Sequence, residues 1–427
     1  MMFRVLCFVL PLLAAHTLYA AGATDVPDAA DGDDPIDALL SVQFDYTWQK
    51  ALITRENTQP VGDESRTVDA RELDYQRNSF RLRPRVEVGL FHDLSTFFEW
   101  PIVLHDQQST RYAEGTTAQN SSIARDMATA PTIQGWGQTQ GSGGDYASED
   151  GTAYGFPATP YNAWKTNPED GVFQSIRAGF DYPTLGLRWS PTNNERDASK
   201  PTITLQADYN LGFIPLPIWN PTEDAHTSED PGAVAQGLHL FHFHVGMSKR
   251  WRLLDPYFLV DYWLPFATSD SYLAASGFQP RHRGGFTMGL EIVALEKEEL
   301  SQKLAVDLRS WMQYHSEGRD YSEMSDALGE LTKTGQFMRV GGQLGLRYQA
   351  LEYLIFELQG AAIYDTEHFI TAEAIGTDKN NNNVVDIALD KNERNPYFNP
   401  VSDTPGRRFK VDENVRLQGM AQLTLAF

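Results

Sequence analysis

Polar and apolar residues alternate along many short segments of this chain, with a period of two. The last segment is the clearest, because it reads RLQGMAQLTLAF from Arg416 to the terminal Phe427. In residues 36–49, every second residue from Leu40 to Phe44 is apolar, and the residues between them are polar. Successive side chains of a β-strand point to opposite faces, so the pattern predicts strands with one apolar face and one polar face.

Eleven further segments share the pattern of residues 36–49. They are residues 78–91, 94–105, 174–189, 201–213, 238–249, 256–264, 284–294, 302–314, 336–348, 352–365 and 410–427. One of them changes phase at Tyr182-Pro183, which predicts a bulge or a late strand start there. Strands of this length suit a membrane, because about 9–11 tilted residues cross a bilayer.

The connections between these segments alternate strictly between long and short. The long ones are residues 53–77, 106–173, 214–237, 265–283, 315–335 and 366–409, and the short ones are 92–93, 190–200, 250–255, 295–301 and 349–351. Outer-membrane barrels have short periplasmic turns, long extracellular loops and an even number of strands. We therefore predict an all-β fold: a transmembrane antiparallel β-barrel of about 12 strands, with both ends in the periplasm.

The first residues resemble a secretory signal peptide. Arg4 precedes an apolar run of residues 5–15, and small residues follow, with cleavage after Ala20 or Ala23. Cys7, the one cysteine, lies inside this segment, so the exported chain carries no thiol. The predicted organisation is a signal peptide at 1–20, an acidic periplasmic linker at 21–35 and the barrel at 36–427.

The alternating strand that ends on Phe427 resembles the C-terminal assembly signal of Gram-negative outer-membrane β-barrels. The resemblance implies a multi-pass protein of the cell outer membrane, inserted by the barrel-assembly machinery through Phe427. Its surroundings would be outer-membrane lipid and lipopolysaccharide. The net charge of −22 argues against nucleic acid as a partner and fits acidic, soluble loops.

The polar face of the second predicted strand carries Arg81, Arg83 and Arg85. Exposure of a guanidinium to lipid would cost roughly 2–4 kcal/mol at the membrane midplane, so these side chains should face the lumen. The other lumen and selectivity candidates are Glu87, Glu99, His242, His244, Asp307, Arg309, Arg339, Arg347 and Arg416. Either the arginines line a pore that favours anions, or acids and bases pair and fill the lumen as a charged core.

Residues 106–173 form the longest predicted loop, and long loops are usually functional or without fixed structure. The loop contains Gly135-Trp136-Gly137 and a glycine-rich stretch at 141–144. We expect either a constriction or lid over the lumen, or a surface loop.

His242 and His244 share the polar face of one predicted strand. Such a pair could bind a transition metal or act as acid and base, and lipid hydrolases of the outer membrane use barrels of this size. Those enzymes need a nucleophile with partners, and the sequence contains no convincing Ser/His/Asn constellation. The prediction is a protein that is not an enzyme.

The last long loop contains Asp378, Asn380, Asn382 and Asp386 at spacings that resemble a calcium loop of the EF-hand or dockerin kind. Oxygen ligands at alternate positions suit Ca²⁺. The match is incomplete, because Asn383 stands where glycine is expected and the closing acid is absent at position 389. An Asn-rich turn is the alternative, and no other cofactor is expected.

These observations favour a porin-like channel for passive diffusion of small solutes through a charged, arginine-lined lumen. The solute itself is not indicated. Alternatives are a non-conducting barrel that presents its loops as an adhesin, receptor or structural surface, and an outer-membrane lipid hydrolase. A further alternative comes from residues 179–188, GFDYPTLGLR, which are similar to a stretch of transporters for aromatic and other hydrophobic compounds. Those transporters are related to long-chain fatty-acid channels.

Overall fold

The computed structural model describes residues 22–24, 26–27, 37–61, 64–128, 164–194, 196–223, 226–269, 271–385, 390–399 and 401–427. The strands are β1 (Ala38–Val61), β2 (Glu64–Phe91), β3 (Leu94–Glu99), β4 (Ile102–Tyr112), β5 (Phe173–Phe180), β6 (Thr184–Thr192), β7 (Thr202–Asn210), β8 (Leu238–Ser248), β9 (Leu254–Ala267), β10 (Arg283–Lys297), β11 (Gln302–His315), β12 (Gly318–Asp320), β13 (Thr332–Thr334), β14 (Phe337–Leu351), β15 (Leu354–Asp365), β16 (His368–Phe369) and β17 (Phe409–Ala426). The helices are short: α1 (Ser122–Ala128), α4 (Tyr272–Ala275), α5 (Ser325–Leu328) and the 3-10 turns η3 (Glu298–Leu300) and η4 (Lys391–Glu393).

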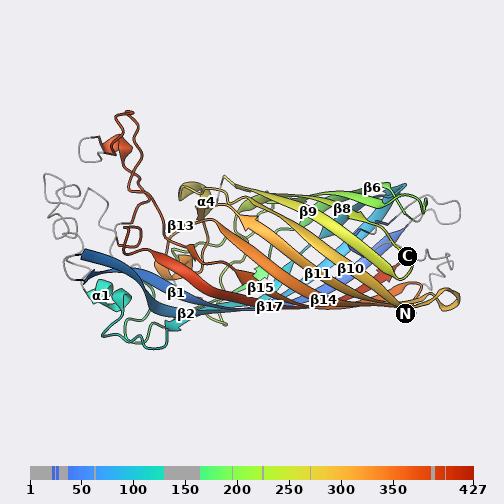
Figure 1. Ribbon diagram of the computed structural model, residues 1–427, viewed down its shortest axis with the longest axis horizontal. Coiled ribbons are helices and arrows are strands. Elements are labelled where there is room, and N and C mark those ends of the chain that lie inside the picture. Colours follow the sequence, from blue (N-terminus) through green and yellow to red (C-terminus); the bar gives the residue numbers. More distant parts are fainter. Residues whose placement is uncertain are drawn as a thin grey trace, which may run out of the picture.

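The main sheet closes on itself (Figure 1). β1 pairs antiparallel with β17 on one side and with β2 on the other, so that Leu40 lies opposite both Leu425 and Val86. The remaining wall follows chain order through antiparallel pairs from β17 back to β2. β3 with β4, and β5 with β6, each form one wall strand in two pieces, so the described residues build the predicted closed barrel of 12 strands.

The two divided wall strands are neighbours, and their breaks lie at the same level. β4 pairs with β5 up to Ile102 and Phe180, and β3 pairs with β6 from Glu99 and Thr184. The phase change predicted at Tyr182-Pro183 is therefore an interruption of the ladder, because proline has no N–H to donate. The matching break before Ile102 was not predicted.

The outer face of the wall is apolar, as the alternation predicts. Large apolar side chains are exposed at every second position of several strands: Leu40, Val42 and Phe44; Leu185, Leu187 and Trp189; Phe243, Val245 and Met247; Leu344 and Leu346. In a soluble protein such a surface would be an aggregation hazard, whereas acyl chains solvate it. No helix among the described residues is long and apolar enough to cross a membrane.

The prediction that residues 53–77 form a loop is wrong. β1 and β2 instead continue as one hairpin, whose ladder runs to the pair Val61 and Glu64. This hairpin extends past the wall beside α1, at the end opposite the C-terminus (Figure 1). The alternation in this region is weaker because the hairpin faces other loops instead of lipid.

A compact hydrophobic core lies at the long-loop end of the barrel. Ile53, Leu73, Ile123, Met324 and Phe409 are fully buried in it. These residues come from β1, β2, α1, the loop before α5, and β17. The extracellular loops therefore fold together into a cap, because they share one apolar interior.

Candidate functional site in the barrel lumen

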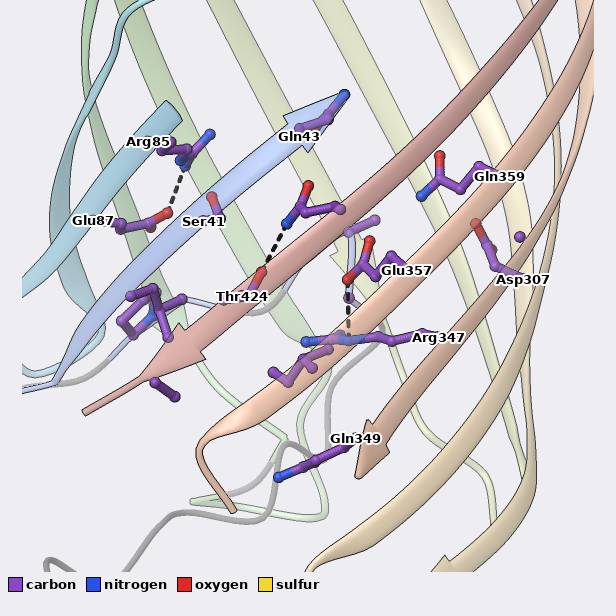
Figure 2. A pocket seen from close by; sticks show the side chains of 18 of the residues that line it. Ser41, Gln43, Arg85, Glu87, Asp307, Arg347, Gln349, Glu357, Gln359 and Thr424 are labelled. Atoms are coloured by element: carbon purple, nitrogen blue, oxygen red, sulfur yellow. Dashed lines mark hydrogen bonds and ion pairs between the residues drawn. The ribbon is translucent and has the colours of Figure 1, made fainter. Parts of the chain in front are cut away.

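A cavity of about 740 Å³ occupies the short-turn half of the lumen (Figure 2). Asp37, Tyr353 and Phe427 line it at the periplasmic rim, where the barrel strands begin and end. Inward-facing residues of the wall strands form its sides. The predicted lumen residues among them are Arg83, Arg85, Glu87, Glu99, Asp307, Arg309 and Arg347.

The arginine ladder of β2 is largely paired. Arg83 Nε lies 2.7 Å from Asp45 Oδ2, and its Nη1 lies 3.7 Å from Glu99 Oε1. Arg85 Nη2 lies 2.5 Å from Glu87 Oε2, as Figure 2 shows. For Arg81 no carboxylate partner is found among the described residues. The partner of Arg85 lies on the same strand, whereas the partners of Arg83 come from β1 and β3.

The other charged side chains around the cavity are paired in the same way. Arg309 Nη2 lies 2.5 Å from Asp307 Oδ2, and Arg347 Nε lies 3.3 Å from Glu357 Oε1 (Figure 2). Arg188 Nη1 joins Glu87 at 3.1 Å. The cavity wall therefore carries paired charges of both signs beside apolar side chains such as Leu346 and Ile355, and a solute in it does not meet one sign of charge alone.

Residues just after the predicted signal peptide enter this half of the lumen. The backbone N–H of Gly22 donates to Glu291 Oε2 (3.0 Å). Thr24 is completely buried, and its hydroxyl lies 2.7 Å from that of Ser248, while Thr204 donates to the Thr24 carbonyl (2.7 Å). Part of the segment predicted as a linker therefore lines the cavity.

A second set of charged residues lies deeper, toward the extracellular end. Asp365 accepts two hydrogen bonds from Arg339, at 2.7 and 2.9 Å, and one from Arg416 at 2.8 Å. On β2, two strands from β17, Arg77 holds Asp106 with two bonds of 2.8 and 2.5 Å. The predicted lumen residues Arg339 and Arg416 thus belong to this upper level and not to the cavity.

Residues 318–334, which we call the plug segment, lie over these ion pairs and contact the wall strands β1, β5 and β17. The segment comprises β12, α5 and β13, and Met324 and Ala327 in it are almost fully buried. Glu323 accepts a hydrogen bond from Gln49 (3.3 Å) and lies 3.8 Å from Arg416 Nη2. The carboxylates of this loop therefore contact the charged side chains of the wall.

The plug segment is held from outside by the last long loop. The Asn399 side chain donates to Glu330 Oε1 (3.0 Å), and the Asn399 N–H donates to Asp403 (2.7 Å). Burial raises the pKa of Glu330 to about 7, even though the bond from Asn399 opposes the shift. Burial also raises the pKa of the Asp403 carboxyl well above its usual range. Both loops therefore dock best with these carboxyls protonated.

His242 and His244 lie on the inner face, as predicted, and His242 has an acid partner that the sequence did not reveal. Its Nδ1 lies 2.8 Å from Asp208 Oδ2, and its ring stacks on Trp263 at 3.7 Å. Asp208 comes from β7, the neighbouring strand. An Asp–His pair can transfer protons, but the described residues contain no group of three or more His, Cys, Asp or Glu that could hold a metal ion.

The predicted calcium loop forms a tight asparagine-rich turn over its described part. Asp378 Oδ2 accepts the N–H of Asn383 (2.7 Å), and Asn380 Oδ1 accepts the N–H of Asn382 (3.0 Å). Both side chains therefore satisfy backbone groups of the turn, as the alternative reading expects. Asp386 lies outside the described residues, and calcium binding stays a prediction.

The predicted constriction by the loop 106–173 also lies partly outside the described residues, since Gly135-Trp136-Gly137 belongs to that part. In its described ends, Ile123 and Trp164 pack in the extracellular core. The constriction therefore stays a prediction. Among the described residues, the plug segment lies over the lumen, with Asp326 bound to Arg177 (2.8 Å). The sequence signals none of these plug contacts, because loop residues have no period and their partners are far away in the chain.

No protein-family model and no curated protein matches the sequence. Among solved structures, the chain is similar to the COG4313 outer membrane channel from Pseudomonas putida, with 10% identity and a TM-score of 0.40 over 94% of this chain and 100% of that one. It is also similar to a Pseudomonas aeruginosa FadL homologue, with 9% identity and a TM-score of 0.35 over 97% of this chain and 96% of that one. These identities and TM-scores are too low to support a conclusion about this chain. Its own closed strand ladder and apolar outer surface identify it as a β-barrel of the outer-membrane kind.

Proposed function

We propose that this protein is an outer-membrane channel for small polar and charged solutes, closed from the outside by its own loops. One observation carries the proposal: the barrel encloses a cavity lined by charged side chains, while the same strands turn apolar side chains outward. A barrel that served only as a platform for loops would gain nothing from a charged cavity of about 740 Å³, because filling it with apolar side chains avoids desolvation of the ions.

Selectivity would come from two sets of charged side chains in the barrel wall. Arg83 and Arg85 line the cavity beside their acid partners, and the field of these adjacent opposite charges orients polar solutes. Arg81 adds a cation that forms no direct ion pair with a described carboxylate, although Asp106 and Asp181 lie close enough to act on its charge. The channel should therefore prefer anions weakly instead of strongly.

Planar-bilayer recordings test the function. The purified protein should conduct rarely, and a variant with the plug segment shortened should conduct often, because the mouth is then open. Substitution of Arg81, Arg83 and Arg85 by serine in that open variant should reduce the preference for chloride over potassium. Unchanged ion selectivity would show that the arginines do not determine selectivity. Absence of conductance in the correctly folded open variant would contradict the proposed channel function.

Transport rather than catalysis is part of this proposal. The pair of Asp208 and His242 would then be a structural feature of the wall, since the His242 ring is stacked on Trp263. Lipid turnover by the wild type that disappears with His242→Ala would instead indicate an enzyme. We further propose that Phe427 is read by the barrel-assembly machinery, because it ends the closing strand β17, and its deletion should lower the amount of assembled barrel.

A further inference from the structure

Arg177 and Trp219 together hold one carboxylate of the plug segment. Arg177 donates to Asp326 from Nη2 (2.8 Å) and from Nε (3.4 Å), and Trp219 donates from Nε1 to the same carboxylate (2.9 Å). The charged side chains of Arg177 and Asp326 are each only 5% exposed. A guanidinium that binds a carboxylate with two N–H groups, joined by an indole N–H, is a complete carboxylate receptor.

The same receptor also holds an aromatic ring. Tyr321 stacks on Trp219 with 3.6 Å between the ring centroids and 4° between the planes, and its hydroxyl donates to the Trp219 carbonyl (2.6 Å). On the Trp219 ring, the Arg177 guanidinium carbon lies 4.4 Å from the centroid. Trp219 thus offers a flat surface next to a cation, and such a surface favours planar ligands.

The two groups that fill this receptor belong to a loop and not to the wall. Tyr321 and Asp326 lie in the plug segment between β11 and β14, which are joined directly by their own ladder from His315 and Phe337 onward. The barrel therefore closes without the plug contacts. A soluble molecule that combines a planar ring with a carboxylate would compete with Tyr321 and Asp326 for the same partners.

We propose that Arg177 and Trp219 form a binding site for aromatic carboxylates, and that Tyr321 and Asp326 occupy this site while the channel is closed. This inference rests on the proposed channel function and names the solute class. Binding of the solute replaces the contacts of Tyr321 and Asp326 with Arg177 and Trp219 by equivalent ones, so these contacts no longer hold the plug segment in place.

The upper lumen favours the onward passage of an anion. Glu323 moves away with the plug, which leaves Arg416 with Asp365 alone as an acid partner. Arg281 and Arg283 form no direct ion pair among the described residues, although Asp320 lies close enough to act on both charges. Arginines at this level of the lumen can therefore attract an entering anion.

Benzoate is the probe for this site, with benzyl alcohol as its uncharged counterpart. Binding to the detergent-solubilised full barrel is measured by calorimetry for the wild type, Asp326→Asn, Tyr321→Leu and Arg177→Gln. Asp326→Asn and Tyr321→Leu should bind benzoate about tenfold more tightly than the wild type, which is the effect of removing one charged hydrogen bond or ring contact from the competitor. Arg177→Gln should lose benzoate binding, and benzyl alcohol should not bind to any of them.

Glu317→Gln is the matched control, because Glu317 lies just before the plug segment but is 68% exposed and 3.9 Å from Lys333 Nζ. It should bind benzoate as the wild type does. The folded barrel is verified for every variant by its heat-dependent mobility on gels. Equal benzoate affinity for all variants would overturn the site, and Tyr321→Leu keeps the test decisive if Arg177→Gln fails to fold.

Bilayer recordings separate this inference from the proposed function. Benzoate added on the loop side should raise the opening frequency of the wild type, and benzyl alcohol should not. If shortening the plug segment opens the channel but benzoate has no effect, the channel function is supported and the proposed binding site is contradicted. If benzoate binds but no folded variant conducts, the binding site is supported and the proposed channel function is contradicted.

Discussion

Arg339 and Asp365 form a two-bond ion pair between neighbouring strands inside the barrel, with Nε–Oδ1 and Nη2–Oδ2 distances of 2.7 and 2.9 Å. Asp365 is completely buried and also accepts bonds from Arg416 (2.8 Å) and Asn414 (3.2 Å). One carboxylate therefore compensates two guanidiniums, so its removal should cost far more than that of an exposed acid.

Asp365→Ala should lower the free energy of unfolding by about 3–5 kcal/mol, because it leaves Arg339 without its acid and Arg416 with only the more distant Glu323. The measurement is urea unfolding of the barrel in detergent micelles. Asp69→Ala is the control, since Asp69 pairs with Lys410 at 2.9 Å but is 41% exposed, and its loss should cost less than about 1 kcal/mol. Equal losses for both variants would contradict the role assigned to burial.

The docking of the plug segment should weaken as the pH rises. The pKa of Glu330 is raised to about 7 in the folded protein, so the folded state holds its proton more tightly than the unfolded chain does. This contribution is complete below the ordinary carboxyl pKa and is lost as the pH rises through about 7. Proteolysis of the extracellular loops should therefore be faster at about pH 8 than at about pH 5. Digestion of an unrelated substrate at each pH corrects for the pH dependence of the protease itself.

Glu330→Gln separates this titration from other pH effects. The amide keeps the size and an acceptor for Asn399 but carries no proton that dissociates, so a large part of the pH dependence should disappear. Asp403→Asn should act in the same direction, because burial also raises the pKa of that carboxyl. A proteolysis rate that keeps its full pH dependence in the double variant would contradict the assignment.

Charge on the outer face should be poorly tolerated. Leu344 is 57% exposed on the outer surface of β14, so Leu344→Arg places a guanidinium in lipid at a cost of roughly 2–4 kcal/mol near the midplane. The neighbouring Gln343 faces inward, where it bonds Gln359, so Gln343→Arg is the matched control and should cost much less. The measurement is refolding into lipid vesicles, and similar costs for both variants would contradict the assignment of the two faces.

The segment after the predicted signal peptide should narrow the periplasmic half of the lumen. Removal of residues 22–27 eliminates the contacts of Gly22 with Glu291 and of Thr24 with Ser248. In a variant with the plug segment shortened, this deletion should raise the single-channel conductance further. Replacement of the same residues by a glycine and serine stretch of equal length is the control, and it should give an intermediate conductance.

The sequence by itself determined the wall. Lipid outside and water inside impose a period of two on each strand, so residues such as Leu344 and Gln343 reveal their faces without any knowledge of their neighbours. The alternation of short and long connections revealed the antiparallel order and the even strand number. The extension of the β1–β2 hairpin was not predicted, because it lies outside the membrane and no lipid imposes the alternating pattern there.

Only the tertiary structure decided the lumen. Arg83 is neutralised by Asp45 and Glu99, which lie on other strands, so its share of the ladder's charge depends on cross-strand register and not on local sequence. Arg177 meets Asp326 from a loop 149 positions away, and loops carry no periodic signal that could reveal the contact. The face that each strand turns to lipid is a local property, whereas the partner of each inward charge is set by closure of the barrel and by the packing of the loops over it.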